Sequence, residues 1–124
     1  MLRVPQVRAL RRAEQEHGIV IGLDCTLRVL CVHTAVVGTA DFAHAQCRDV
    51  FRELIRHNCV KFAYVHNHPG GCRRPSKVDR EVTRWLRRAG RWLGIPLLAH
   101  VIVPGGSGDP VDVRPARARA RTAA

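Results

Sequence analysis

Two histidines and a nearby carboxylate form the most informative group of residues in this sequence. His66 and His68 are two apart at the end of an apolar, strand-like run, so their side chains should project from one face. Pro69 then turns the chain away, and Ser76 and Asp79 open a segment with helical periodicity. Two histidines and a carboxylate suit zinc, and three protein ligands leave a fourth position for water. Zinc lowers the pKa of such a water to about 7, so the pattern predicts one catalytic zinc per chain.

Each part of this group also has an ordinary structural explanation. Histidines two apart often occur on surfaces or in cores without binding a metal. Ser-X-X-Asp is typical of a helix N-terminus, with Ser76 as the cap and Asp79 favoured by the helix dipole. The metal hypothesis therefore depends on both parts occurring together, at the two ends of one turn.

The surrounding segments alternate between helical and strand patterns. Helices are predicted at 5–16, at 46–57 and from Ser76 to a stop at Gly94 and Pro96, and strands at 17–24, 27–37, 59–66 and 97–103. This order favours an α/β three-layer sandwich in which helices flank one mixed sheet. We expect a single domain over residues 1–104 and a flexible, Arg-rich tail over 105–124.

Composition narrows the class of protein. The 124 residues, 46% of them hydrophobic, are enough for one modest core. No apolar run approaches the ~20 residues that cross a bilayer, and the N-terminus lacks a secretory signal. The five cysteines include no Cys-X-X-Cys pair, which argues against a zinc knuckle or a disulfide framework. We expect a cytoplasmic protein in a reducing compartment, with no membrane partner.

Basic residues are in clear excess. Lys and Arg number 21 against 10 Asp and Glu, a net charge of +11. Eight of these basic residues lie between Arg73 and Arg91, where Asp79 and Glu81 are the acidic residues. This segment could bind nucleic acid or another polyanion. The alternative is a solvated helix face in an arginine-rich protein.

The spacing of His66, His68, Ser76 and Asp79 resembles the metal signature of the JAB/MPN (JAMM) metalloprotease superfamily. The flanking sequence is similar to RadC-like JAB proteins of bacteria, through HNHPGG, the following PS and D, and the run T-X-X-L-X-X-A-G-X-X-L-G-I-P-L-L-X-H-V-I-V. The similarity extends from Glu16 to Pro104. It implies a zinc hydrolase scaffold related in shape to cytidine deaminases.

The resemblance also assigns roles to individual residues. It implies metal ligands at His66, His68 and Asp79, and an oxyanion-assisting serine at Ser76. The family's glutamate, which hydrogen-bonds the zinc water, corresponds to Glu16. Glu14 is a nearby alternative, and either carboxylate could instead be an ordinary solvated residue.

The sequence departs from the RadC-like pattern in three places. Gly70 replaces a serine, which should loosen the turn, and Ala99 precedes His100 where the family commonly has an orienting aspartate. The chain also has no room for the family's N-terminal helix-hairpin-helix portion. The remaining histidines lack ligand spacing and are expected to be surface or satisfied strand residues: His17, His33, His44, His57 and His100.

Two functions from different classes follow. The first is a zinc-dependent metallopeptidase or isopeptidase acting on an unknown peptide or isopeptide, with Glu16 as base. The second is a nucleic-acid-associated protein without peptidase activity, since RadC-like proteins are associated with DNA repair. A base deaminase is disfavoured because His-X-Glu and Pro-Cys-X-X-Cys are missing. A scaffold with a degenerate site is disfavoured because all the expected ligands are present, and the oligomeric state is left open.

Overall fold

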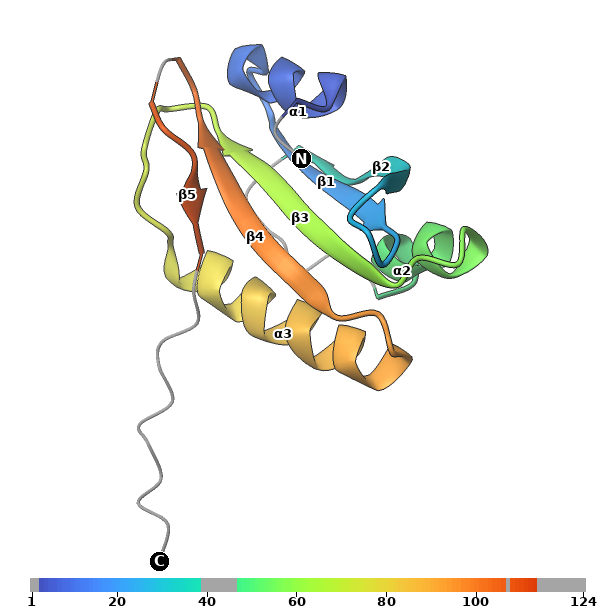
Figure 1. Cartoon of the computed structure of the whole chain (residues 1–124). Helices are drawn as coiled ribbons and strands as arrows, with labels where there is room; N and C mark the ends of the chain where they lie inside the picture. The colour runs from blue at the N-terminus through green and yellow to red at the C-terminus, as the bar shows by residue number, and fades with distance from the viewer. Residues whose placement is uncertain (1–2, 39–46, 107, 114–124) are drawn as a thin grey trace, which may run out of the picture.

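A five-stranded mixed sheet forms the centre of the computed structural model (Figure 1), which describes residues 3–38, 47–106 and 108–113. The strand order is β2-β1-β3-β4-β5. Neighbouring strands are antiparallel except β3 and β4, which run parallel. The strands are β1 Glu16–Leu23, β2 Val29–Gly38, β3 Lys61–His68, β4 Leu97–Pro104 and β5 Val111–Asp112.

Helices cover both faces of this sheet (Figure 1). The short helix α1 (Pro5–Ala9) and the 3-10 turn η1 (Leu10–Arg12) bury Val7 and Leu10 on one face. On the other face, α2 (Cys47–Arg56) and α3 (Lys77–Leu93) pack against the side chains of Val20, Phe62 and Tyr64. The α/β three-layer sandwich predicted from the sequence is confirmed.

Helix α3 links the two parallel strands and has well-defined ends. Ser76 caps its N-terminus in a reciprocal capping box with Asp79, and Gly94 ends it in the left-handed conformation at φ 73°. Its buried residues, Asp79, Thr83, Leu86 and Gly90, recur every three or four positions. The first two are polar, so the helix presents a polar end and an apolar end to the sheet.

The N-terminal helix is shorter than the predicted span of 5–16. It ends at Arg12, and Glu16 is the first residue of β1. The reason is the buried side chain of Asn67, which donates hydrogen bonds to the backbone oxygens of Leu10 and Gln15 and accepts one from the backbone nitrogen of His17. These bonds hold the chain in an extended path where helix formers alone would continue the helix.

The sheet also extends beyond Pro104, where the sequence analysis placed the end of the domain. In the described part of that segment, Val111 and Asp112 pair with Ile102 and Val101 of β4. Val113 is buried and its nitrogen donates to the oxygen of His100 at 2.7 Å. A two-residue strand among Gly and Pro has too little periodicity to be seen in sequence. Residues 114–124 lie outside the described part of the chain.

None of the helices within the described ranges is both long and apolar enough to cross a membrane.

Candidate metal centre

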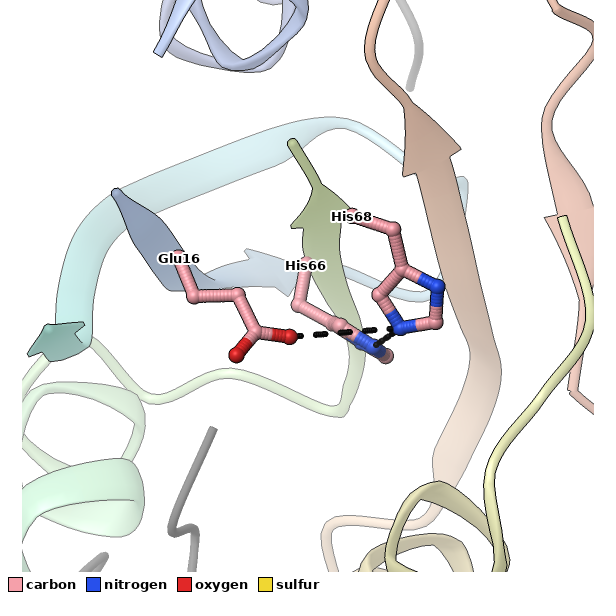
Figure 2. Close-up of side chains that lie close together, drawn as sticks. All are labelled: Glu16, His66 and His68. Atoms are coloured by element: carbon pink, nitrogen blue, oxygen red, sulfur yellow. Dashed lines mark hydrogen bonds and ion pairs between the residues drawn. The ribbon is translucent and has the colours of Figure 1, made fainter. Parts of the chain in front are cut away.

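The predicted metal ligands meet where the end of β3 faces the start of α3. The side chains of His66 and His68 project from one face of β3, and Asp79 lies in the first turn of α3. In the antiparallel β1–β3 pair, Gly18 lies opposite His66, so Glu16 begins β1 beside His68. Figure 2 shows the Glu16 carboxylate directed toward the two imidazoles.

The ligand atoms converge on one point. Nε2 of His66 lies 3.0 Å from Oδ1 of Asp79, and Nε2 of His68 lies 3.2 Å from Oδ2. The two Nε2 atoms are 3.1 Å apart, and Oε1 of Glu16 is 3.9 Å from Nε2 of His68. The side chains of His66 and Asp79 are 0% and 2% exposed. The structure thus brings together the three residues assigned as ligands, with Glu16 next to them, whereas Glu14 is exposed.

Asp79 is held in place by the start of its own helix. Its Oδ2 accepts a hydrogen bond from the backbone nitrogen of Ser76 at 2.7 Å, and its nitrogen donates to Oγ of Ser76 at 3.1 Å. Burial opposes ionisation of Asp79, but the bonds from Ser76 and a bond from His66, when its Nε2 carries a proton, outweigh it and hold the pKa of Asp79 well below the usual range. The helix-capping explanation and the metal-ligand explanation therefore apply to the same residues.

The neighbours of His68 determine which of its nitrogens carries the proton. Its Nδ1 lies 3.0 Å from the backbone oxygen of Cys72. A carbonyl oxygen can only accept, so Nδ1 must be protonated. In the neutral ring, Nε2 then carries a lone pair directed at Asp79.

A chain of buried hydrogen bonds likewise determines that Nδ1 of His66 carries the proton. Oγ1 of Thr83 donates to the backbone oxygen of Asp79 at 3.0 Å, so it must accept from Nδ1 of His100 at 2.6 Å. Nε2 of His100 is then an acceptor for Nδ1 of His66 at 2.7 Å. Burial, and the charge of His66 when that ring is protonated, lower the pKa of His100 to about 3, which keeps the His100 ring neutral. In the neutral ring, the Nε2 atom of His66 is left with its lone pair facing Asp79.

The protonation states of His66, His68 and Asp79 determine whether the cluster fits a metal. Two Nε2 lone pairs and an ionised carboxylate lie within 3.2 Å of one another, and they repel unless a positive charge lies between them. A proton or a metal ion can supply that charge. Two nitrogens bound to tetrahedral zinc at 2.0–2.1 Å are about 3.3 Å apart, close to the separation found here. The donor set and its spacing fit zinc.

Glu16 lies beside the ligands in a partly buried position. Burial raises its pKa above that of an ordinary carboxyl, and the positive charge that His66 and His68 can carry opposes the shift. The ligand-type atoms of Glu16, His66 and His68 all lie within 4.8 Å of one another. The base candidate and the candidate metal ligands therefore share one small volume.

His100 and Thr83 are the residues whose part in the site the sequence analysis missed. His100 is a satisfied strand histidine, as expected, but its partner is His66 itself. Thr83 follows Asp79 by four residues, so its place on the same helix face could have been read from spacing. The position of His100 depends on the parallel register of β3 and β4, which spacing does not reveal.

Ala99 and the remaining histidines lie away from the centre. Ala99 packs in the cluster beneath α1, on the sheet face opposite the site, so a carboxylate at that position would point away from the candidate metal ligands. Rings outside the centre bond to nearby backbone oxygens instead: His17 to Gln15, His33 to Asp49 and His57 to Glu53. His44 lies outside the described residues.

Comparison of the sequence with known proteins identifies a family and several relatives. The RadC-like JAB domain family matches residues 3–110. A UPF0758 protein of Thermotoga maritima is 48% identical over 90 residues, which are 73% of this chain and 40% of that protein. A UPF0758 protein of Thermosynechococcus vestitus is 38% identical over 99 residues, 80% of this chain and 39% of that protein. The chain therefore spans well under half the length of these relatives.

The residues matched by the family include most of the sheet and all of the candidate site. It covers every strand of the sheet except β5, and it includes Glu16 and the whole histidine–aspartate cluster. The chain belongs to the RadC-like JAB domain family.

Proposed function

We propose that this chain is a zinc-dependent hydrolase of the JAMM type that cleaves an amide bond in a peptide or isopeptide. The observation that carries the proposal is the convergence of two histidine lone pairs and the Asp79 carboxylate on one point. His66, His68 and Asp79 would hold one zinc ion per chain. When bound, zinc supplies a Lewis acid for the scissile carbonyl and lowers the pKa of a water to about 7.

Glu16 is proposed as the general base and acid. Its carboxylate accepts the proton of the attacking water and returns it to the leaving amine. A pKa raised by burial suits both steps, because the group must gain and then lose a proton near neutral pH. Its place at the start of β1, fixed through Asn67, holds it beside the histidines.

Ser76 is proposed to support the oxyanion that forms as the carbonyl is attacked. Its hydroxyl accepts from the nitrogen of Asp79, and a hydroxyl that accepts one bond can still donate its own hydrogen. An oriented donor next to the reacting carbonyl favours the charge that develops there.

Zinc content is the first test, followed by hydrolysis. We expect about one zinc per purified chain, and almost none in the double variant His66→Ala/His68→Ala, because three protein ligands are the minimum for such a site. His57→Ala, which removes an exposed histidine, is the matched control and should keep its zinc. A wild-type chain that takes up no zinc even after the metal is added back would overturn the proposal.

A screen of peptide and isopeptide substrates then tests the reaction itself. The control is Glu16→Gln, which should keep its zinc and lose about 10²–10⁴-fold in rate, the usual contribution of a general acid–base. Equal rates in the wild type and in Glu16→Gln would remove Glu16 from the mechanism.

A second candidate function is nucleic-acid binding along α3, and one arrangement favours it. Helix geometry of ~100° per residue places six exposed basic side chains within an arc of about 100°, opposite the buried face. Trp92, 86% exposed, follows at the end of this surface. The basic residues are Lys77, Arg80, Arg84, Arg87, Arg88 and Arg91.

A salt titration tests this second function independently of zinc. Affinity for an oligonucleotide should fall steeply as salt rises, since each phosphate contact releases a counterion. Arg84→Gln/Arg88→Gln should reduce the salt slope by about 2, whereas Arg52→Gln on α2 should leave it unchanged. A slope that is the same in all three proteins would exclude this face.

A further inference from the structure

Two cysteines far apart in sequence lie together at the other end of the sheet face that carries the candidate metal centre. Cys31 belongs to β2, and Cys59 lies between α2 and β3. Their Sγ atoms are 3.6 Å apart. Cys59 is buried and Cys31 is half-buried, while the other three cysteines, Cys25, Cys47 and Cys72, are exposed.

A glycine makes room for this pair of thiols. Gly22 of β1 lies directly opposite Cys31 in the sheet register. A Cβ atom at Gly22 would lie 2.7 Å from Sγ of Cys31 and closer still to Sγ of Cys59. Any larger residue would push the sulfurs away, so the missing side chain allows both thiols to sit over β1.

We propose that Cys31 and Cys59 form a reversible disulfide when the protein meets a peroxide. The bond would tie β2, one of the two edge strands of the described sheet, to the segment that joins α2 to β3. To form the bond, the sulfurs have to approach from 3.6 Å to a bond length of about 2.05 Å.

The chemistry balances in two steps. The thiol of Cys31 is oxidised by the peroxide to a sulfenic acid, and hydrogen peroxide leaves as one water. The sulfur of Cys59 then bonds to the sulfur of Cys31, the S–OH bond breaks, and the thiol proton leaves with the hydroxyl as a second water. The two thiols lose two electrons in all, and a dithiol reductant reverses the reaction.

The different surroundings of the two thiols determine which reacts first. Cys31 is the more accessible to a peroxide. Burial and the neighbouring Cys31 raise the pKa of Cys59 to about 12, so Cys59 stays a protonated thiol and is a poor first target. Cys31 is therefore the site of attack and Cys59 the resolving partner.

Mass spectrometry on the full chain tests the proposal. In the variant Cys25→Ser/Cys47→Ser/Cys72→Ser, hydrogen peroxide should remove about 2 Da from the intact mass and yield a peptide that links Cys31 to Cys59. Dithiothreitol should restore the mass. The disulfide closes a long loop, so the melting temperature should rise by about 5 °C or more on oxidation.

Three further variants make the result decisive. Cys31→Ser in the same background should leave Cys59 as a free thiol that peroxide does not convert. Gly22→Ala should lower the disulfide yield several-fold, whereas Gly70→Ala, at a position with open space, should not. The proposal is overturned if Cys31 gains oxygen while Cys59 remains a free thiol. The part assigned to Gly22 is overturned if a folded Gly22→Ala protein forms the disulfide as readily as the wild type.

Discussion

The two ends of the β1–β3 pair, on the sheet face covered by α2 and α3, are built from opposite chemistry. At one end, buried polar groups pair with one another from His66 through His100 to Thr83. At the other end, the ring of Phe62 packs edge-on against that of Phe51 among apolar side chains, with the ring centroids 5.2 Å apart. All five of these residues are buried, so burial by itself does not distinguish a functional region from a structural one.

The difference between the two ends lies in how each is stabilised. Apolar packing is non-directional, and its contribution scales with the area removed from water. A buried hydrogen-bond chain depends on every member, because the loss of one partner leaves another polar group unpaired. We therefore expect substitutions at the apolar end to change stability, and substitutions at the polar end to change metal binding first.

The largest expected effect is at the apolar end. Phe62→Ala should lower the free energy of unfolding by about 3–5 kcal/mol, because it leaves a cavity against Phe51. Urea denaturation measures this loss. Zinc affinity of the folded variant, from competition with a chelator, should stay within a few-fold of wild type. A tenfold loss of affinity would show that the two ends are coupled.

Metal removal should destabilise the polar end. A free zinc concentration of 100 times the dissociation constant should stabilise the fold by about 2.7 kcal/mol relative to the protein from which a chelator has removed the zinc. For a chain of this size, that corresponds to a rise in melting temperature of about 10 °C. His66→Ala/His68→Ala should melt at one temperature with or without zinc, and a similar rise in this variant would place the metal elsewhere.

A smaller effect on zinc affinity should follow from breaking the hydrogen-bond chain at Thr83, which reaches His66 through His100. Thr83→Val keeps the shape of the side chain but leaves Nδ1 of His100 without its acceptor. We expect zinc affinity to fall about 10–100-fold, the usual cost of losing an outer partner of a ligating histidine. Thr83→Ser restores the hydroxyl and should restore affinity, which a purely packing role for Thr83 would not predict.

The smallest effect concerns an exposed carboxylate just beyond the apolar end. Asp24 accepts hydrogen bonds from the backbone of Arg28 and from the side chain and backbone of Thr26, and these lower its pKa. A lowered pKa in the folded state means that its contribution to stability is present above pH ~4 and is lost as the pH falls through the folded value. Asp24→Asn should therefore be slightly less stable than wild type at pH 7, and the difference should vanish in acid.

The local features of the site could be predicted because they depend on neighbouring residues. Two histidines two apart must share a face of a strand, and Ser76 three residues before Asp79 must suit a helix N-terminus, whatever surrounds them. The amphipathic pattern of α3 likewise requires only its own residues. Glu16 was identified through a resemblance, although the sequence pattern assigned it to the end of a helix.

Contacts between distant segments could not be predicted in the same way. The bond between His100 and His66 depends on the parallel register of β3 and β4, and the approach of Cys31 to Cys59 depends on a glycine in a third strand. Strand β5 leads into Val113, which is buried, and the sequence of this segment does not reveal that burial.

By itself, then, the sequence determined which residue types were available and which face of its own element each occupies, since the periods of helix and strand are local. Only the tertiary structure decided which of them meet, and therefore which nitrogen of His66 and of His68 carries a proton. The reason is physical: a tautomer depends on its hydrogen-bond partner, and the partner of His66 comes from a strand 34 residues away.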